Sequence, residues 1–292
     1  MELAVHLRDP SELTALDGVA QHLTGLYGAD GPEIARRLPR RTRRVYVGDE
    51  FCLNRLPSLR ELNRFLEEAK AGKWKLTILT PPLTDEGLDT CAPLFERLER
   101  GDPATEVVVN DWGLLVYLKT RYPDFRLAAG RLLNKGFKDP RLPEPNKFSQ
   151  LSREAEDLLK GCTFDSADFQ EKMLQMQVER LERDLFPYGE PRVKGLESFG
   201  VSVYLPFGYV TSGRVCWLSS FHSSGKSKFS LGKPCDRLCS RLSLDLSRPE
   251  WKLRVFQSGN GIFYLYPASL LGSFLEWAQR RKLRLVYQGL AV

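Results

Sequence analysis

The sequence lacks the features that would assign it to several common protein classes. It has no apolar run of about eighteen residues, and its opening stretch, MELAVHLRDP, carries charge where a signal peptide would be apolar. We therefore expect no transmembrane helix, no signal peptide and a cytoplasmic location. Only three histidines occur, without an H-E-x-x-H motif or a Ser/His/Asp set. Their scarcity argues against a zinc protease or a serine protease.

The bulk composition is that of a globular protein. The 292 residues are 42% hydrophobic and 27% charged, which suits a chain that folds around a packed core. This length accommodates one large α/β barrel or two ordinary domains. The formal charge of +6 mildly favours anionic partners. Six cysteines in a chain that we expect to remain in a reducing compartment are typical of metal ligands or buried thiols rather than disulfides.

The first half of the sequence alternates short apolar strands with amphipathic helices. We predict strands at 2–7, 45–47, 75–79, 106–109 and 126–129. We predict helices at 11–27, 58–72 and 84–101, and another that begins at 111, with 28–44 as a turn-rich basic connection. Ser58 and Glu61 have the spacing of a capping box. Apolar strands that alternate with amphipathic helices indicate a parallel sheet covered by helices.

The second half is less regular. A proline-rich polar excursion at 138–163 precedes a predicted amphipathic helix at 168–186. Strands are predicted at 193–195, 201–205, 253–256, 262–266 and 283–287, with a helix at 268–281. The pattern predicts an α/β fold of the TIM-barrel type, one domain over 1–292 whose second half is irregular. An open doubly wound sheet with a small C-terminal module is the alternative.

A polar loop at 215–242 contains three of the cysteines, Cys216, Cys235 and Cys239. The loop has no apolar periodicity, so we expect it to be ordered by a ligand, to be functional, or both. Three soft thiolates need a fourth for a tetrahedral set. Cys52 follows a predicted strand, at the end where a parallel barrel has its site, and is the fourth candidate. Spacing alone does not distinguish zinc from an iron–sulfur cluster.

The remaining cysteines and one histidine have less specific settings. Cys91 lies in an apolar helix and Cys162 in an irregular segment, and both are interpreted as inert thiols. His222 lies inside the cysteine loop, where it is either a pocket residue that hydrogen-bonds to a sulfur or an exposed residue. No base is paired with either Cys91 or Cys162 in the sequence pattern.

Several segments occur in an order that resembles a known family. They are VYVGDEFC, EVVVNDWG, RLAAGRLLNK and the C-x18-C-x3-C loop, between residues 44 and 242. Together they are similar to the UbiU/UbiV branch of the collagenase-like peptidase family of unassigned catalytic type, and closest to the UbiV type. The resemblance implies a TIM-barrel-like fold and a 4Fe-4S cluster on Cys52, Cys216, Cys235 and Cys239. It also implies oxygen-independent hydroxylation, in ubiquinone synthesis or on RNA, beside a homologous subunit in a heterodimer.

Polar residues follow two neighbouring predicted strands at the expected site end. Asn110 and Asp111 are either helix caps, which is the commoner role, or cavity residues. Arg131 either binds a carboxylate, phosphate or ring oxygen of a substrate or forms a salt bridge, and Asn134 follows it closely. These four are the predicted substrate-binding residues, and no residue is assigned a catalytic role.

A basic run at 36–44 contains six arginines. It is either a surface for RNA, an anionic substrate or an acidic partner, or a solvated connection before a strand. The sequence has no RNA-binding signature in which aromatic residues are interleaved with the basic ones.

Three functions agree with the sequence. The first is a component of oxygen-independent hydroxylation of an aromatic, ubiquinone-precursor-like substrate or a nucleobase. Four cysteine ligands leave no iron position open, which favours electron transfer or a structural role for the cluster. The second is a peptidase, for which the sequence offers no recognisable nucleophile–base pair. The third is a non-enzymatic scaffold in which a cluster or a zinc ion only holds the loop.

Overall fold

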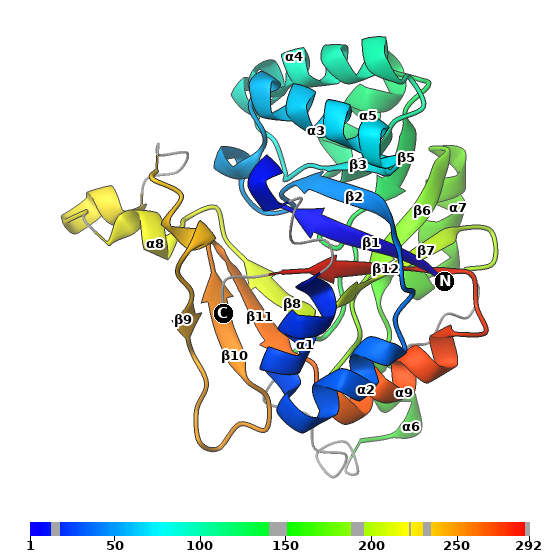
Figure 1. Ribbon diagram of the computed structural model, residues 1–292, viewed down its shortest axis with the longest axis vertical. Helices are drawn as coiled ribbons and strands as arrows, with labels where there is room; N and C mark the ends of the chain where they lie inside the picture. Colours follow the sequence, from blue (N-terminus) through cyan, green and yellow to red (C-terminus); the bar gives the residue numbers. More distant parts are fainter. Residues whose placement is uncertain (13–17, 140–150, 188–195, 222, 230–234, 290–292) are drawn as a thin grey trace.

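The structure of this chain is a computed structural model that describes residues 1–12, 18–139, 151–187, 196–221, 223–229 and 235–289. Eight parallel strands close into a barrel (Figure 1). Around the barrel, they are β1 (Glu2–Leu7), β12 (Leu283–Gln288), β7 (Gly200–Leu205), β6 (Val178–Arg183), β5 (Arg126–Ala129), β4 (Glu106–Val109), β3 (Lys75–Leu79) and β2 (Thr42–Gly48). β1 pairs with both β12 and β2, which closes the sheet. The closure confirms the TIM-barrel-like fold and excludes the open-sheet alternative.

The helices around the barrel are α1 (Val19–Tyr27), α2 (Gly31–Arg36), α3 (Leu59–Gly72), α4 (Asp85–Gly101), α5 (Trp112–Arg121), α6 (Arg153–Lys160), α7 (Ala167–Gln175) and α9 (Ala268–Ala278). A further short helix, α8 (Trp217–Ser220), lies outside this layer (Figure 1). In Figure 1, α3, α4 and α5 lie on one side of the barrel, and α1, α2 and α9 lie on the opposite side. Outward side chains of the strands, such as Val45 and Ile78, share one core with helix residues such as Leu62 and Phe65. Within the described residues, no helix has the length and apolar character needed to cross a membrane.

Local sequence signals set the starts of three barrel helices. The Ser58 hydroxyl accepts a hydrogen bond from the backbone N–H of Glu61, and the Glu61 carboxylate accepts one from the backbone N–H of Ser58. This is the predicted capping box of α3. Thr84 caps α4 and Asp111 caps α5 by accepting a backbone N–H in the same way. The predicted helices between 58 and 121 are confirmed and begin at these signals, and the strands predicted at 75–79, 106–109 and 126–129 are confirmed as β3, β4 and β5.

The predicted helix at 168–186 is wrong in its second half. The structure has α7 up to Gln175 and then the barrel strand β6. Gln177, between them, has a φ of +57°, which ends the helical path. In β6, Arg180 and Glu182 face the barrel interior, where residues of other strands provide charged and polar partners. Those partners are distant in sequence, so the spacing of apolar residues alone favoured a helix.

Other boundaries also differ from the sequence prediction. The helix predicted at 11–27 is described only from Val19 onward as α1. The connection predicted at 28–44 contains α2 and the start of β2, and the excursion at 138–163 contains α6. The strand predicted at 193–195 and His222 lie outside the described residues.

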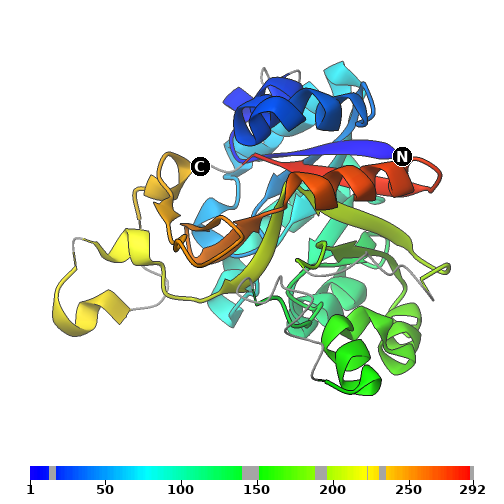
Figure 2. The same cartoon turned by 90° about the horizontal axis from the view of Figure 1, so that it is seen from below.

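A second, antiparallel sheet adjoins the barrel. Its strands, in order, are β8 (Phe207–Ser212), β11 (Gly261–Leu265), β10 (Val255–Ser258) and β9 (Leu244–Asp245). β10 and β11 confirm two predicted strands, but they form a hairpin in this sheet and take no part in the barrel. In Figures 1 and 2, this sheet and α8 lie beyond the end of the barrel toward which β1 points. The cysteine loop therefore belongs to the carboxyl end of the barrel strands.

The barrel interior has an apolar middle and charged ends. The middle layer consists of Ala4, Tyr46, Leu79, Val108, Ala128, Tyr204 and Val286. One group of buried ion pairs lies at the amino ends of the strands, and another lies at the carboxyl ends. The interior is a packed core, as in other barrels of this type, rather than a pore.

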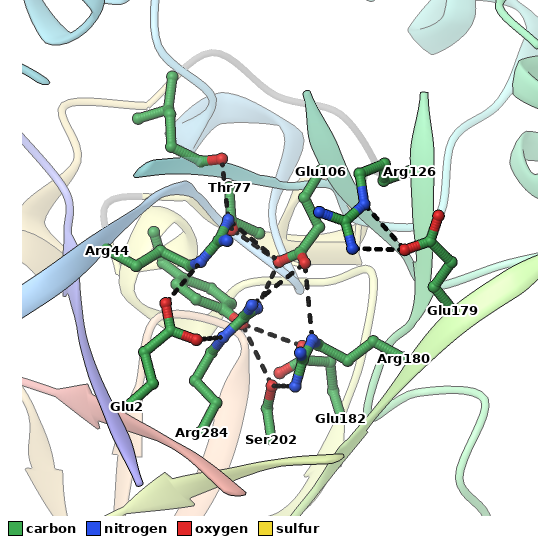
Figure 3. Close-up of polar contacts among 12 residues, drawn as sticks. Glu2, Arg44, Thr77, Glu106, Arg126, Glu179, Arg180, Glu182, Ser202 and Arg284 are labelled. Atoms are coloured by element: carbon green, nitrogen blue, oxygen red, sulfur yellow. Dashed lines mark hydrogen bonds and ion pairs between the residues drawn. The ribbon is translucent and has the colours of Figure 1, made fainter. Parts of the chain in front are cut away.

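Glu106 is at the centre of the ion pairs at the amino ends, which we call the base network (Figure 3). The base network consists of Glu2, Arg44, Glu106, Arg180 and Arg284. The Glu106 carboxylate accepts hydrogen bonds from Arg284, and lies 3.6 Å from Arg44 Nη1 and 3.5 Å from Arg180 Nε. Burial alone would raise the pKa of Glu106, but Arg284 and Arg44 lower it to about 2. At this end of a barrel, buried charges stabilise the fold rather than act on a substrate.

Candidate functional site at the carboxyl end of the barrel

The segment after β2 positions two of the site's residues, Glu50 and Cys52. Asp49 Oδ1 accepts hydrogen bonds from the backbone N–H groups of Phe51 and Cys52 at 2.8 and 2.9 Å, which fixes a tight turn. Gly48, just before the turn, has a φ of +104°, and a Cβ added there would lie 2.3 Å from a backbone oxygen of β3. Only glycine fits this approach. The turn buries Glu50 and leaves Cys52 half-buried.

Four charged side chains form a buried network at the carboxyl ends of the strands, which we call the rim network. Arg131 Nε donates to both carboxylate oxygens of Glu50 at 3.1 Å, and its Nη1 donates to Asp184 Oδ1 at 2.8 Å. Lys138 Nζ donates to Asp184 Oδ2 at 2.8 Å. All four side chains are at most 4% exposed. Two cations and two anions thus balance one another inside the protein, as burial of charge requires.

Aromatic rings enclose the cations of the rim network. The Arg131 guanidinium carbon lies 3.7 Å from the centre of the Tyr204 ring and 5.5 Å from that of Phe51. Lys138 Nζ lies 5.1 Å from the centre of the Tyr209 ring. Such contacts stabilise cations that have lost their water.

The pKa values of the two carboxylates of the rim network shift in opposite directions. Burial raises the pKa of Glu50 above its ordinary value, although Arg131 opposes that shift. Burial acts in the same direction on Asp184, but Lys138 and Arg131 outweigh it and lower its pKa. Asp184 is therefore the more acidic of the two carboxyl groups.

One contact brings the cysteine loop to the segment after β2, and another brings it to the turn between β10 and β11. Asn54 Nδ2 donates a hydrogen bond to Cys235 Sγ over 3.8 Å, and Cys52 lies only two residues before Asn54. A Cβ added to Gly259, in the turn between β10 and β11, would lie 3.7 Å from Cys239 Sγ. The loop, the hairpin turn and the segment after β2 therefore meet at one place.

Cys239 interacts electrostatically with each of the other three predicted ligands. Burial raises the pKa of Cys239, and negative charge on Cys216 or Cys235 raises it further. Burial likewise raises the pKa of Cys52 to about 12, and Cys239 is among the charges that contribute. The four thiols that the sequence selects thus share one electrostatic neighbourhood. Without a cation, that neighbourhood keeps Cys52 and Cys239 protonated at neutral pH.

Two arginines surround these thiols with positive charge. Arg55 Nε pairs with Asp49 Oδ2 at 3.2 Å, and its side chain is 10% exposed. Burial would lower the pKa of Arg55, but Asp49, and then Cys239 and Cys52, raise it. Arg55 Nη2 and Arg8 Nη1 are buried and have no hydrogen-bond partner among the described residues. Buried donors without partners are rare in folded proteins, so these two favour an additional acceptor beside the thiols.

The donor set and its surroundings fit an iron–sulfur cluster. Thiolates are the ligands that such clusters use, and N–H groups near cluster sulfurs stabilise their negative charge. Within the described ranges, no three histidine, cysteine, aspartate or glutamate side chains are already arranged to hold a metal ion. Metal binding is linked to local folding and to loss of protons from the ligands.

A cavity opens beside Cys235. Its volume is about 460 Å³, and its polar wall contains Asn54, Cys235 and Arg237. Apolar residues such as Leu59 and Leu94 form most of the remaining wall of the cavity. This volume and this mixture of walls are typical of small-molecule sites.

The structure gives scaffold contacts to Asn110 and Asp111. Asn110 Nδ2 donates to the backbone oxygen of Thr80 at 2.9 Å, and its Oδ1 accepts the backbone N–H of Leu132 at 3.0 Å. Asp111 Oδ1 accepts the backbone N–H of Leu114 at 2.8 Å and caps α5. The capping interpretation of Asp111 is confirmed. Asn110, at the end of β4, ties together the segments that follow the two neighbouring strands, β3 and β5.

Arg131 and Asn134 are also buried. Arg131 is fully enclosed by the rim network, which confirms the salt-bridge alternative for this residue. Asn134 is 3% exposed, and its Oδ1 accepts the backbone N–H of Phe164 at 3.4 Å. Both residues lie at the predicted end of the barrel, where they support the rim.

Sequence reasoning missed several residues that the structure places at this site. Asp49 and Glu50 stand three and two residues before Cys52 in V-Y-V-G-D-E-F-C, and acidic residues after an apolar strand were an available signal. Asp184 was missed because the helix predicted at 168–186 included it, although the residue directly follows the strand β6. Arg55 was missed because nothing in the sequence of its segment shows that it pairs with Asp49 and lies near Cys239 of the distant loop.

The two remaining cysteines show no sign of activation. Burial raises the pKa of Cys91 to about 11, and it does the same for Cys162. Cys162 Sγ lies 3.1 Å from Asp165 Oδ2, to which it donates. Thiols with such pKa values are weak nucleophiles at neutral pH, which gives the peptidase hypothesis no support from either residue.

Comparison of the chain with family models, curated proteins and solved structures finds no match in any of the three.

Proposed function

We propose that this chain binds a 4Fe-4S cluster through Cys52, Cys216, Cys235 and Cys239 and takes part, as the electron-transferring component, in an oxygen-independent hydroxylation. The observation that carries the cluster proposal is the contact between the cysteine loop and the segment after β2, where the Asn54 amide donates to Cys235 Sγ two residues from Cys52. When bound, the cluster supplies one-electron redox chemistry. The aromatic or nucleobase substrate, the homologous partner subunit and the cytoplasmic location rest on the sequence reasoning above.

The chain's own residues would prepare the cluster site in three ways. Asp49 holds the turn that presents Cys52, and Asn54 orients Cys235 through its amide hydrogen bond. Arg55 supplies buried positive charge, together with an N–H group available to a sulfur acceptor. Hydrogen bonds and positive charge beside cluster sulfurs raise the reduction potential, because they stabilise the more negative reduced state.

The rim network would act as a positioning element for the site. Arg131 holds Glu50, and Glu50 lies in the same turn as Cys52. The network is closed to solvent, so it is suited to fixing backbone positions rather than to contacting a substrate. The cavity beside Cys235 is the place where an aromatic substrate or an electron-transfer partner would approach the thiols.

Replacing any one of the four proposed ligands by serine is expected to remove the cluster. Anaerobically purified wild-type chain should carry about four iron and four sulfide per chain and absorb near about 400 nm. Each variant, Cys52→Ser, Cys216→Ser, Cys235→Ser or Cys239→Ser, should lose most of its iron, because serine oxygen is a poor substitute for thiolate. Iron and sulfide analysis with a visible spectrum measures this loss.

Cys91→Ser and Cys162→Ser are the matched controls and should retain the full iron content. Wild-type chain without iron or sulfide would overturn the proposal, and so would equal iron loss in the two controls. A structural metal site is distinguished by circular dichroism and thermal unfolding of Cys235→Ser. Unfolding of the variant favours a scaffold role, whereas an intact fold with lost electron transfer favours the proposed one.

Metal binding to the cluster-free chain is expected to strengthen as pH rises. Because burial holds the pKa of Cys52 at about 12, its thiol must lose a proton to bind a metal at neutral pH. Each proton released makes the apparent affinity rise about tenfold per pH unit. Competition for zinc with a chromophoric chelator at several pH values measures the slope.

The Cys52→Ser variant should bind zinc more weakly. Its binding should release about one proton fewer, so its affinity should rise less steeply with pH. Zinc affinity that does not change between acidic and neutral pH would contradict the assignment of thiols as ligands.

A further inference from the structure

The basic run at 36–44 does not form one continuous surface. Arg44 is buried in the base network, where it donates to the Thr77 hydroxyl at 2.9 Å. Arg37 donates to the backbone oxygen of Gly272 at 2.7 Å and thereby ties α2 to α9. These two arginines therefore hold parts of the fold together. The other four arginines of the run remain as candidates for ligand binding.

The remaining arginines of the run converge on a cavity of about 610 Å³, which we call the basic cavity. Its cationic lining consists of Arg36, Arg40, Arg41, Arg43 and Lys73. All five residues are exposed, and none of the described residues that line the cavity is acidic. Apolar residues on the same walls give it a mixed lining.

Four of the five cations have no counter-charge in the described part of the chain. Arg36 pairs with Glu33 at 2.6 Å, whereas no ion pair occurs at Arg40, Arg41, Arg43 or Lys73 among the described residues. Like charges gathered in a concave surface repel one another and raise the local concentration of anions. A bound anion with several charges would relieve that repulsion.

The position of the basic cavity separates it from the cysteine site. Leu3 and Thr42, which line it, lie at the amino ends of β1 and β2, and Trp74 directly precedes β3. Cys52 follows the carboxyl end of β2, and α8, which directly follows Cys216, lies beyond the same end of the barrel (Figure 1). A ligand in the basic cavity would therefore not be the substrate of the cysteine site.

We propose that the basic cavity binds a small organic polyphosphate of the nucleoside di- or triphosphate class. Arginine is suited to phosphate because its guanidinium group donates two parallel hydrogen bonds. Four unpaired cations match two or three phosphate groups. Leu38 and Trp74 supply apolar surface for an organic moiety, and the volume is that of a small-molecule site. An extended nucleic acid would instead favour an open, shallow basic surface.

Calorimetric titration of the full-length chain at low ionic strength tests this proposal. The probes are inorganic triphosphate, ADP, ATP, adenosine and a single-stranded RNA oligonucleotide. We expect binding of triphosphate, ADP and ATP, tighter binding of ATP than of triphosphate because of the apolar wall, and no binding of adenosine. The triple variant Arg40→Ala/Arg41→Ala/Arg43→Ala should lose at least about tenfold in affinity for ATP.

The control variant Arg121→Ala/Arg153→Ala/Arg248→Ala removes the same number of exposed charges elsewhere and should bind as the wild type does. A double variant, Arg40→Ala/Arg41→Ala, repeats the test without changing a strand residue. Equal losses in the triple and control variants would mean attraction by net charge alone and overturn the proposal. Retained ATP binding in the triple variant, or binding of RNA without ATP, would also overturn it. None of these readouts depends on the cysteines.

Discussion

Replacing Glu106 with glutamine is expected to lower the free energy of unfolding by about 3–5 kcal/mol. The carboxylate is 4% exposed and faces Arg44, Arg180 and Arg284. A neutral amide would leave buried guanidinium groups with less opposing charge, and removing one partner from a buried ion network is strongly destabilising. Urea unfolding at neutral pH, followed by circular dichroism, measures the change.

Glu179→Gln is the matched control for Glu106→Gln. Glu179 also pairs with an arginine, Arg126, and both are drawn in Figure 3, but their side chains are 49% and 44% exposed. An exposed pair contributes between about 0 and 1 kcal/mol, because water already solvates both charges. Equal destabilisation by the two substitutions would contradict the role assigned to burial.

The same substitution should change how stability depends on pH. The folded-state pKa of Glu106 is about 2, below the value of about 4.3 in an unfolded chain. Its stabilising contribution is therefore complete above about pH 4.3 and is lost as pH falls toward 2. The wild type should lose stability in this window more steeply than Glu106→Gln. The net shift is opposite for Glu182: burial raises its pKa to about 7 because the nearby arginines do not outweigh it, so Glu182 lowers stability as pH rises from about 4.3 to 7.

Replacing Arg131 with methionine is the second change for which we expect a large effect, again about 3–5 kcal/mol. Methionine fills much of the same volume but leaves Glu50 and one oxygen of Asp184 without their buried cation. The contact with the face of the Tyr204 ring is lost as well. Chemical unfolding measures the loss, and iron content reports whether the turn that carries Cys52 still presents its thiol.

A double variant separates charge from packing at this position. Arg131→Met/Glu50→Gln removes the carboxylate that Arg131→Met leaves uncompensated, so it should recover part of the lost stability. Arg100→Met removes an exposed arginine whose side chain is 74% exposed, and it should change stability by less than about 1 kcal/mol. No recovery in the double variant would show that packing rather than charge balance dominates.

The parts of the fold that the sequence predicted well are those with strong local signals. The capping box at Ser58 and Glu61 and the apolar run of β3 depend on residues within a few positions of one another, so the local sequence is enough to predict them. β6 was misread because V-E-R-L-E-R has charged residues at positions that point into the barrel. A charged residue in a strand interior is stable only if distant strands supply partners, as Glu106 does for Arg180.

In the candidate site too, some features could be predicted from the sequence and others depend on distant partners. Chain order and the rule that barrel sites lie at the carboxyl ends of strands were enough to associate Cys52 with the loop at 215–242. The rim network could not be predicted, because Arg131 reaches Glu50 across 81 residues and Asp184 across 53. Its parts have no common sequence motif.

By itself, the sequence determined the alternation of strands and helices in the first half of the barrel and the starts of α3, α4 and α5, and it selected four candidate thiols, because apolar periodicity, capping residues and cysteines are local properties. The tertiary structure decided which charges are neutralised. Closing the barrel buried Arg44 and Arg131 among carboxylates from other strands, whereas Arg40, Arg41 and Arg43 were left to line a cavity. Coulomb energy depends on distance and on exclusion of water, and neither quantity is defined until the chain has folded.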